Sequence, residues 1–127
     1  MAATYSPAAL IAAHTDFLGK LDAGTGPGKV VIYDASDVTL VTVTLTDPAG
    51  TVNGTTGQLT LTQAGVGTAV ADGTASYAEF MDSDDTVHLT VDVFGTDTGT
   101  AQSGFITLNN RAIITSAEVS ILSAVIG

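Results

Sequence analysis

The sequence predicts an all-β fold, a single β-sandwich or jelly-roll-like domain with one N-terminal α-helix. Three observations predict it. Runs of alternating apolar and polar residues recur along most of the chain, and turn-forming residues separate them at short intervals. Threonine, whose β-branched hydroxyl side chain suits a half-buried sheet, is frequent. With 127 residues, 45% of them hydrophobic, the chain is long enough to bury one core and too short for two.

One helix is expected, over residues 7–22. Ser6 can act as its N-cap, Pro7 suits the first helical position, and the glycines and proline of 24–28 end it. Its apolar stripe comprises Leu10, Ile11, His14, Phe17, Leu18 and Leu21. The helix either caps the open end of the sandwich or reaches a neighbouring subunit. We divide the chain into an N-terminal arm, residues 1–28, with this helix and a Gly/Pro hinge, and a β-sandwich domain, residues 29–127.

About seven strands are expected after the hinge. The first half of the domain contains the runs 30–33, 39–46 and 58–62, and Asp47-Pro48-Ala49-Gly50 is expected to form a turn because proline cannot continue a ladder. The second half contains the runs 74–81, 87–93, 104–108 and 117–126. In the last run Val119, Ile121, Ser123 and Val125 are expected to share one face.

The charge balance excludes several classes of partner. Three basic residues against thirteen acidic ones give a net charge of −10, so a patch that neutralises phosphates is not expected and neither is docking on an anionic membrane. The chain has no cysteine, which excludes disulfides and thiolate metal sites. No run approaches the ~20 apolar residues of a membrane span, and residues 1–7 lack the basic start of a secretory signal. We expect a protein that is made and kept in the cytoplasm until it is assembled or released.

The acidic turn Asp82-Ser83-Asp84-Asp85 is the nearest approach to a metal motif. A calcium loop needs a glycine to turn the chain and usually a bidentate glutamate further on, and both are missing here. We interpret the segment as a solvated hairpin turn whose aspartates accept backbone N–H groups, and its binding of a cation is left open. His14 and His88 are the two histidines, and His14 is expected to bond a backbone carbonyl.

No catalytic constellation is found. The serines lack a G-x-S-x-G elbow, and the glycine-rich segment 24–29 follows a helix instead of a strand, so we interpret it as a hinge. Asp34 and Asp37 could do acid/base work in principle, but the absence of tryptophan leaves little aromatic surface for a sugar cleft. We therefore expect no enzymatic activity and no cofactor.

Several segments resemble, in their order, the small head-decoration (cement) proteins of tailed bacteriophages and prophages. These are Leu21 to Tyr33, Thr44 to Pro48, the Gly-Thr-Ala strand that ends in Asp-Ser-Asp within residues 73–85, Ile106 to Asn110 and Ile114 to Ile121. The likeness covers most of the chain. Asp85 departs from it, because a glycine is common at this place in such turns.

The resemblance implies a virion structural protein that binds the outside of the capsid as a reinforcing clamp. It further implies two partners, the major capsid protein and further copies of this chain in a homotrimer. Tyr5, Leu10 and Phe17 of the arm, with Val125 and Ile126 at the end of the sequence, are the candidate contact residues, and the alternative for each is an ordinary position in the core. The alternative is a tail-fibre or spike module that binds a host receptor or carbohydrate through the loops 50–57 and 95–104.

Overall fold

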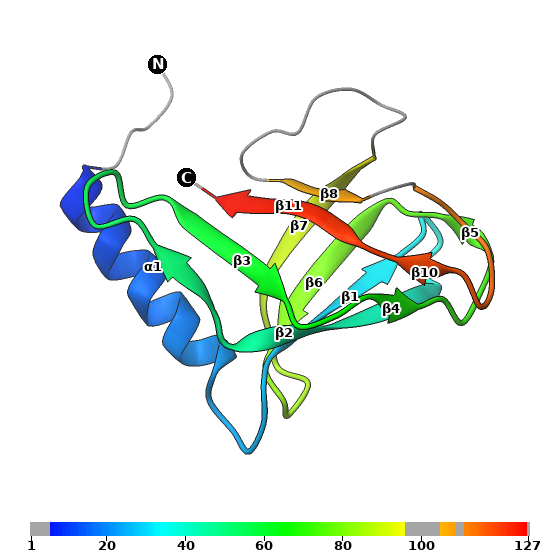
Figure 1. The fold of residues 1–127 in the computed structure, drawn as a ribbon, viewed down its shortest axis with the longest axis horizontal. Helices are drawn as coiled ribbons and strands as arrows, with labels where there is room; N and C mark the ends of the chain where they lie inside the picture. The colour runs from blue at the N-terminus through cyan, green and yellow to red at the C-terminus, as the bar shows by residue number, and fades with distance from the viewer. Residues whose placement is uncertain (1–5, 96–104, 109–110, 127) are drawn as a thin grey trace.

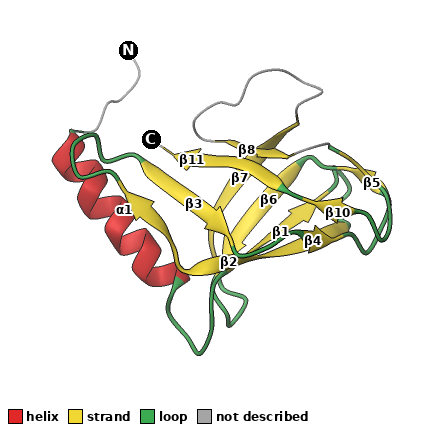
Figure 2. Cartoon of the chain, viewed as in Figure 1, coloured by secondary structure: helices red, strands yellow, loops and turns green. Residues whose placement is uncertain are grey.

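A computed structural model describes residues 6–95, 105–108 and 111–126 and shows a β-rich chain with one helix (Figures 1 and 2). Helix α1 spans Pro7–Leu21. The strands are β1 Lys29–Tyr33, β2 Thr39–Val52, β3 Leu59–Gln63, β4 Gly67–Thr68, β5 Gly73–Thr74, β6 Tyr77–Met81, β7 Val87–Gly95, β8 Phe105–Leu108, β9 Ala112–Ile113, β10 Glu118–Val119 and β11 Ile121–Ile126. The prediction of a mainly β chain with one N-terminal helix is confirmed.

The long strands form a closed barrel in the order β1-β2-β3-β11-β8-β7-β6. Neighbouring strands are antiparallel except β7 and β8, which are parallel. The predicted sandwich or jelly roll is not confirmed, because β1 pairs with both β2 and β6 and thereby joins the two edges that a sandwich would leave apart. Two short ladders, β10-β4 and β5-β9, extend from the barrel at the end away from α1 (Figure 1).

The core lies inside the barrel, where alternate residues of each strand point inward. Val30 and Ile32 of β1 are fully buried, as is Phe80 of β6, the largest of the fully buried side chains. The threonines of β2 occupy the alternate positions, and Thr42 and Thr44 are exposed. Threonine side chains of β2 therefore lie on the outside of the barrel, as the sequence predicts.

Helix α1 lies across one end of the barrel (Figure 1). Its start is as predicted, since the Ser6 Oγ accepts a hydrogen bond from the Ala9 N–H at 3.2 Å and Pro7 occupies the first turn. Leu21 is fully buried in the barrel core, and Phe17 and Leu18 pack against it. The Ala49 N–H donates to the Asp22 Oδ1 at 3.0 Å, which ties the end of the helix to β2. The helix thus closes one end of the barrel.

The predicted turn at residues 47–50 is wrong, because β2 continues through it to Val52. The pairing with β3 shifts register between Leu45 and Gly50, so this segment forms a bulge. Pro48 lies in the bulge, where the N–H that proline lacks is not needed for the ladder. The Thr46 hydroxyl donates to the Pro48 carbonyl at 2.8 Å and helps to close the bulge.

Two predicted strands are each divided in two. The run 74–81 separates into β5 and β6, and the Ser76 N–H between them donates to the Tyr33 carbonyl at 2.9 Å. The run 117–126 separates into β10 and β11, and the pairing of β11 with β8 shifts register between Ile121 and Ser123. Ala124 is buried at 3% exposure. The expected single face through residues 119–125 is therefore interrupted by a bulge.

Candidate functional site

Three of the five predicted contact residues, Leu10, Val125 and Ile126, lie at one end of β3. Leu10 packs beside Gly57, just before β3, because a Cβ built on Gly57 would lie 2.5 Å from the Leu10 Cβ. Val125 and Ile126 pair through their backbones with Thr60 and Leu59 of the same strand. Phe17 is half-buried against the barrel core, and Tyr5 lies outside the described residues. The arm and the last strand thus both lie against the start of β3.

His14 fixes the helix to this end. Its Nδ1 lies 2.6 Å from the Gly57 carbonyl oxygen, which confirms the expected bond to a backbone carbonyl. Gly57 has a φ of +79°, a left-handed conformation that favours glycine. The side chains of Leu10 and Phe17, which are half-buried, also pack the helix against the barrel.

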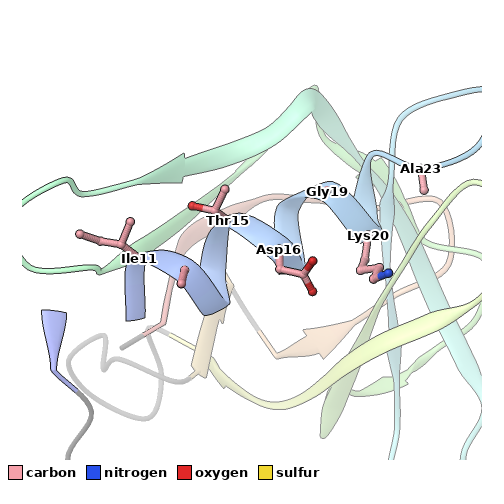
Figure 3. A pocket seen from close by; sticks show the side chains of 7 residues that line it. Ile11, Thr15, Asp16, Gly19, Lys20 and Ala23 are labelled. Carbon is pink, nitrogen blue, oxygen red and sulfur yellow. The ribbon is translucent and has the colours of Figure 1, made fainter. Parts of the chain in front are cut away.

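The outer side of α1 carries a shallow groove of about 670 Å³ (Figure 3). Its described lining comprises Ile11, Ala12, Thr15, Asp16, Gly19, Lys20 and Ala23. Most of these side chains are small, and one acidic and one basic group accompany them. The described lining contains no histidine and no more than one carboxylate.

The acidic turn forms the hairpin cap that the sequence predicts. The Asp82 Oδ1 accepts hydrogen bonds from the N–H groups of Asp84 at 2.9 Å and Thr86 at 3.0 Å, and the Oδ2 lies 3.1 Å from the His88 Nε2. These contacts, the Thr86 N–H above all, hold the pKa of the Asp82 carboxyl below its ordinary value. Asp85 has a φ of +67°, the conformation for which a glycine is the usual choice, and forms an ion pair with Lys29.

The glycine-rich segment after the helix packs against this turn. A Cβ on Gly24 would lie 2.2 Å from the Ser83 Oγ, and one on Gly28 would lie 3.2 Å from the Met81 carbonyl oxygen. The glycines therefore allow a close approach between two loops. Within residues 6–95, 105–108 and 111–126 no group of three or more histidine, aspartate and glutamate side chains could hold a metal ion.

Exposed aliphatic side chains occupy the opposite end of the barrel, which we call the loop end and define by Val38, Val70 and Ile114. Their side chains are 46%, 67% and 67% exposed. Backbone hydrogen bonds connect the three loops that carry them, since the Val70 N–H donates to the Leu40 carbonyl and the Ser116 N–H to the Ala69 carbonyl, both at 2.8 Å. The loop end thus carries three exposed aliphatic side chains on loops that backbone hydrogen bonds connect.

A polar anchor holds the same loops. The N–H and the hydroxyl of Thr115 both donate to the Asp72 Oδ1, at 2.6 and 2.8 Å. These two hydrogen bonds, with the N–H contributing more, lower the pKa of the Asp72 carboxyl. The sequence pattern did not indicate this contact, because 43 residues separate the partners.

Asp34 and Asp37 do not face each other as an acid/base pair would. The Asp34 Oδ1 accepts the N–H groups of Ser36 and Val38 and so shapes the turn between β1 and β2. The Asp37 Oδ1 accepts the hydroxyl of Tyr77 at 2.6 Å, and the Tyr77 ring is stacked on that of Tyr33. Sequence reasoning missed this aromatic pair, because Tyr33 ends one predicted strand whereas Tyr77 lies inside another.

Comparison with protein-family models, with curated proteins and with solved structures finds no match. In the part of the chain that the structure describes, no helix has the length and apolar character to cross a membrane.

Proposed function

We propose that the chain is a structural protein of a phage virion, which binds to the outside of the capsid and stabilises it. Its partners are the major capsid protein and two further copies of itself in a trimer at the junctions of capsid hexamers. The order of the segments that resemble head-decoration proteins supports the proposal, and so does a small barrel that α1 closes at one end and that carries exposed aliphatic side chains at the other.

The loop end carries the proposal. Large aliphatic side chains that are about half to two-thirds exposed on neighbouring loops favour a protein contact, since burial of one such side chain contributes about 1.5–3 kcal/mol. The hydrogen bonds from Val70 to Leu40 and from Thr115 to Asp72 hold these loops in place before binding. A surface that is ordered in advance loses less conformational entropy on association.

Assembly in many copies supplies the strength that one small surface lacks. Three aliphatic side chains provide a modest contact for each copy, but a trimer that engages the shell at three points gains from effective concentration. The net charge of −10 keeps unbound copies soluble and repels them from packaged nucleic acid. Both properties suit a protein added to the outside of a filled head.

The test is binding of the purified protein to phage heads that lack it. The double variant Val70→Thr, Ile114→Thr places two hydroxyls at the loop end; the first change preserves side-chain size, and the second also shortens the side chain by one carbon. Val87→Thr makes the size-preserving change at a 41% exposed valine beside the acidic turn. If the loop end binds, the double variant loses about 2 kcal/mol of contact, a roughly 30-fold weaker affinity for heads. The Val87 variant binds as the unmodified protein does.

Two results would count against the proposal. Equal affinity of the double variant and the Val87 variant removes the loop end from the contact. Failure of the unmodified protein to bind heads, together with saturable binding of a glycan array by the isolated protein, favours a receptor-binding module instead.

A further inference from the structure

Two tyrosines form an aromatic platform on the outside of the barrel. Tyr33 ends β1 and Tyr77 begins β6, and the two are direct partners in the antiparallel register between these strands. Their ring centroids lie 5.0 Å apart with an interplanar angle of 17°, a stacked arrangement. Ile32, which precedes Tyr33, is fully buried, so alternation places the tyrosine on the outer surface.

The platform is held in place by carboxylates. The Tyr77 hydroxyl donates to the Asp37 Oδ1 at 2.6 Å, and Asp37 belongs to the turn that Asp34 shapes. This hydrogen bond, with lesser effects, raises the pKa of Tyr77 to about 12. Burial and then the neighbouring Glu79 carboxylate raise the pKa of Tyr33 to about 12. Both phenols therefore stay neutral and keep their hydrogens at neutral pH.

The acidic groups around the platform are not neutralised within the described chain. Glu79 lies one outward position along β6 from Tyr77, and Asp92 of β7 is the direct cross-strand partner of Tyr77. The ion pairs among residues 6–95, 105–108 and 111–126 are Lys29 with Asp85 and His88 with Asp82, so neither involves these two carboxylates nor Asp37. Partly exposed aromatic rings thus lie among three carboxylates.

We propose that this platform binds an arginine side chain presented by a protein partner. A planar guanidinium stacks on an aromatic face and donates in parallel to a carboxylate, which a lysine ammonium cannot do in the same geometry. The occupant follows from charge complementarity, since the surface offers π-faces and three carboxylates. The platform adjoins the loop end, because Asp37 directly precedes Val38, but the inference does not rest on the proposed function.

The test uses tyrosine fluorescence, because the chain has no tryptophan and three tyrosines. In a Tyr5→Phe background the emission comes from Tyr33 and Tyr77 alone. The probes are three short acetylated and amidated peptides that are identical except for a central arginine, lysine or citrulline. We expect a saturable change with the arginine peptide, at least about fivefold weaker binding of the lysine peptide, and no binding of the citrulline peptide.

Variants locate the site. Glu79→Gln removes one charge next to the platform and is expected to weaken arginine binding about tenfold. Asp47→Asn removes one charge from the exposed β2 bulge and is the matched control, which should bind as the parent does. Tyr77→Phe keeps the ring and is expected to retain binding within about threefold, whereas Tyr77→Leu abolishes it.

Several outcomes would overturn the proposal. The first is a fluorescence change that rises linearly with peptide concentration and does not saturate. The second is equal affinity for the arginine and lysine peptides. The third is an equal loss of affinity in Glu79→Gln and Asp47→Asn, because such a loss reflects net charge alone. Far-ultraviolet circular dichroism checks that each variant folds. If Tyr77→Leu does not fold, the comparison of the Glu79 and Asp47 variants decides the matter.

Discussion

Docking of helix α1 on the barrel can be tested through Leu21. Leu21 is fully buried in the barrel core, although it belongs to the helix. Leu21→Ala removes most of a buried aliphatic side chain, with a transfer loss of about 2 kcal/mol, and the residual cavity raises the expected loss of unfolding free energy to about 3 kcal/mol. For a chain of this length the corresponding fall in Tm is about 10 °C.

Ile11→Ala is the matched control. Ile11 lies on the same helix, lines the outer groove and is only half-buried, and its replacement by alanine removes the same number of atoms. We expect a loss below about 1 kcal/mol. The assay is urea unfolding followed by circular dichroism, with equal m-values as the condition for comparison. Equal losses for the two variants would refute the docking of the helix through Leu21.

Two further predictions concern the acidic turn and the β2 bulge. Asp82→Asn removes the charge that bonds Thr86 and His88. Because the pKa of Asp82 is lower in the folded chain than in the unfolded one, the variant should be less stable at pH 7. The deficit should begin to shrink below about pH 4, where the unfolded carboxyl takes up its proton, and should disappear below the lowered pKa of the folded chain. A deficit as large at pH 2.5 as at pH 7 in urea unfolding contradicts this. Gly50→Ala would place a Cβ 2.1 Å from the Thr60 carbonyl oxygen and should lower the free energy of unfolding in urea by about 2–3 kcal/mol. Gly65→Ala is the control, because a Cβ there has no atom within 4 Å, and it should leave the free energy of unfolding almost unchanged. Similar losses for the two variants would contradict the close approach at Gly50.

Local patterns predicted the parts of the fold that local interactions determine. The helix follows from Ser6, Pro7 and the spacing of the apolar residues, and the acidic turn follows from the capacity of Asp82 to accept nearby N–H groups. Pro48 misled the prediction because the bulge that accommodates it depends on pairing with β3, which the sequence around Pro48 does not reveal. Closure of the barrel likewise depends on the pairing of distant strands, such as β1 with β6.

At the candidate surfaces, too, the sequence indicated local features but not the contacts between distant residues. Leu10 and Phe17 were found as apolar positions of a helix, but the structure gives both a packing role at the end of the barrel. Tyr33 and Tyr77 are 44 positions apart in the sequence and meet only through the β1–β6 register. The one local signal was Tyr33, which ends a predicted strand directly before Asp34. This signal does not indicate which residue packs against the Tyr33 ring.

The most direct test of the proposed function is a cryo-electron microscopy reconstruction of the phage particle that carries this protein. We predict density for the barrel on the outer surface of the capsid, in groups of three at the junctions of hexamers, with the loop end of Val38, Val70 and Ile114 against the shell. Density confined to the tail, or a capsid surface without the barrel, would contradict the proposal.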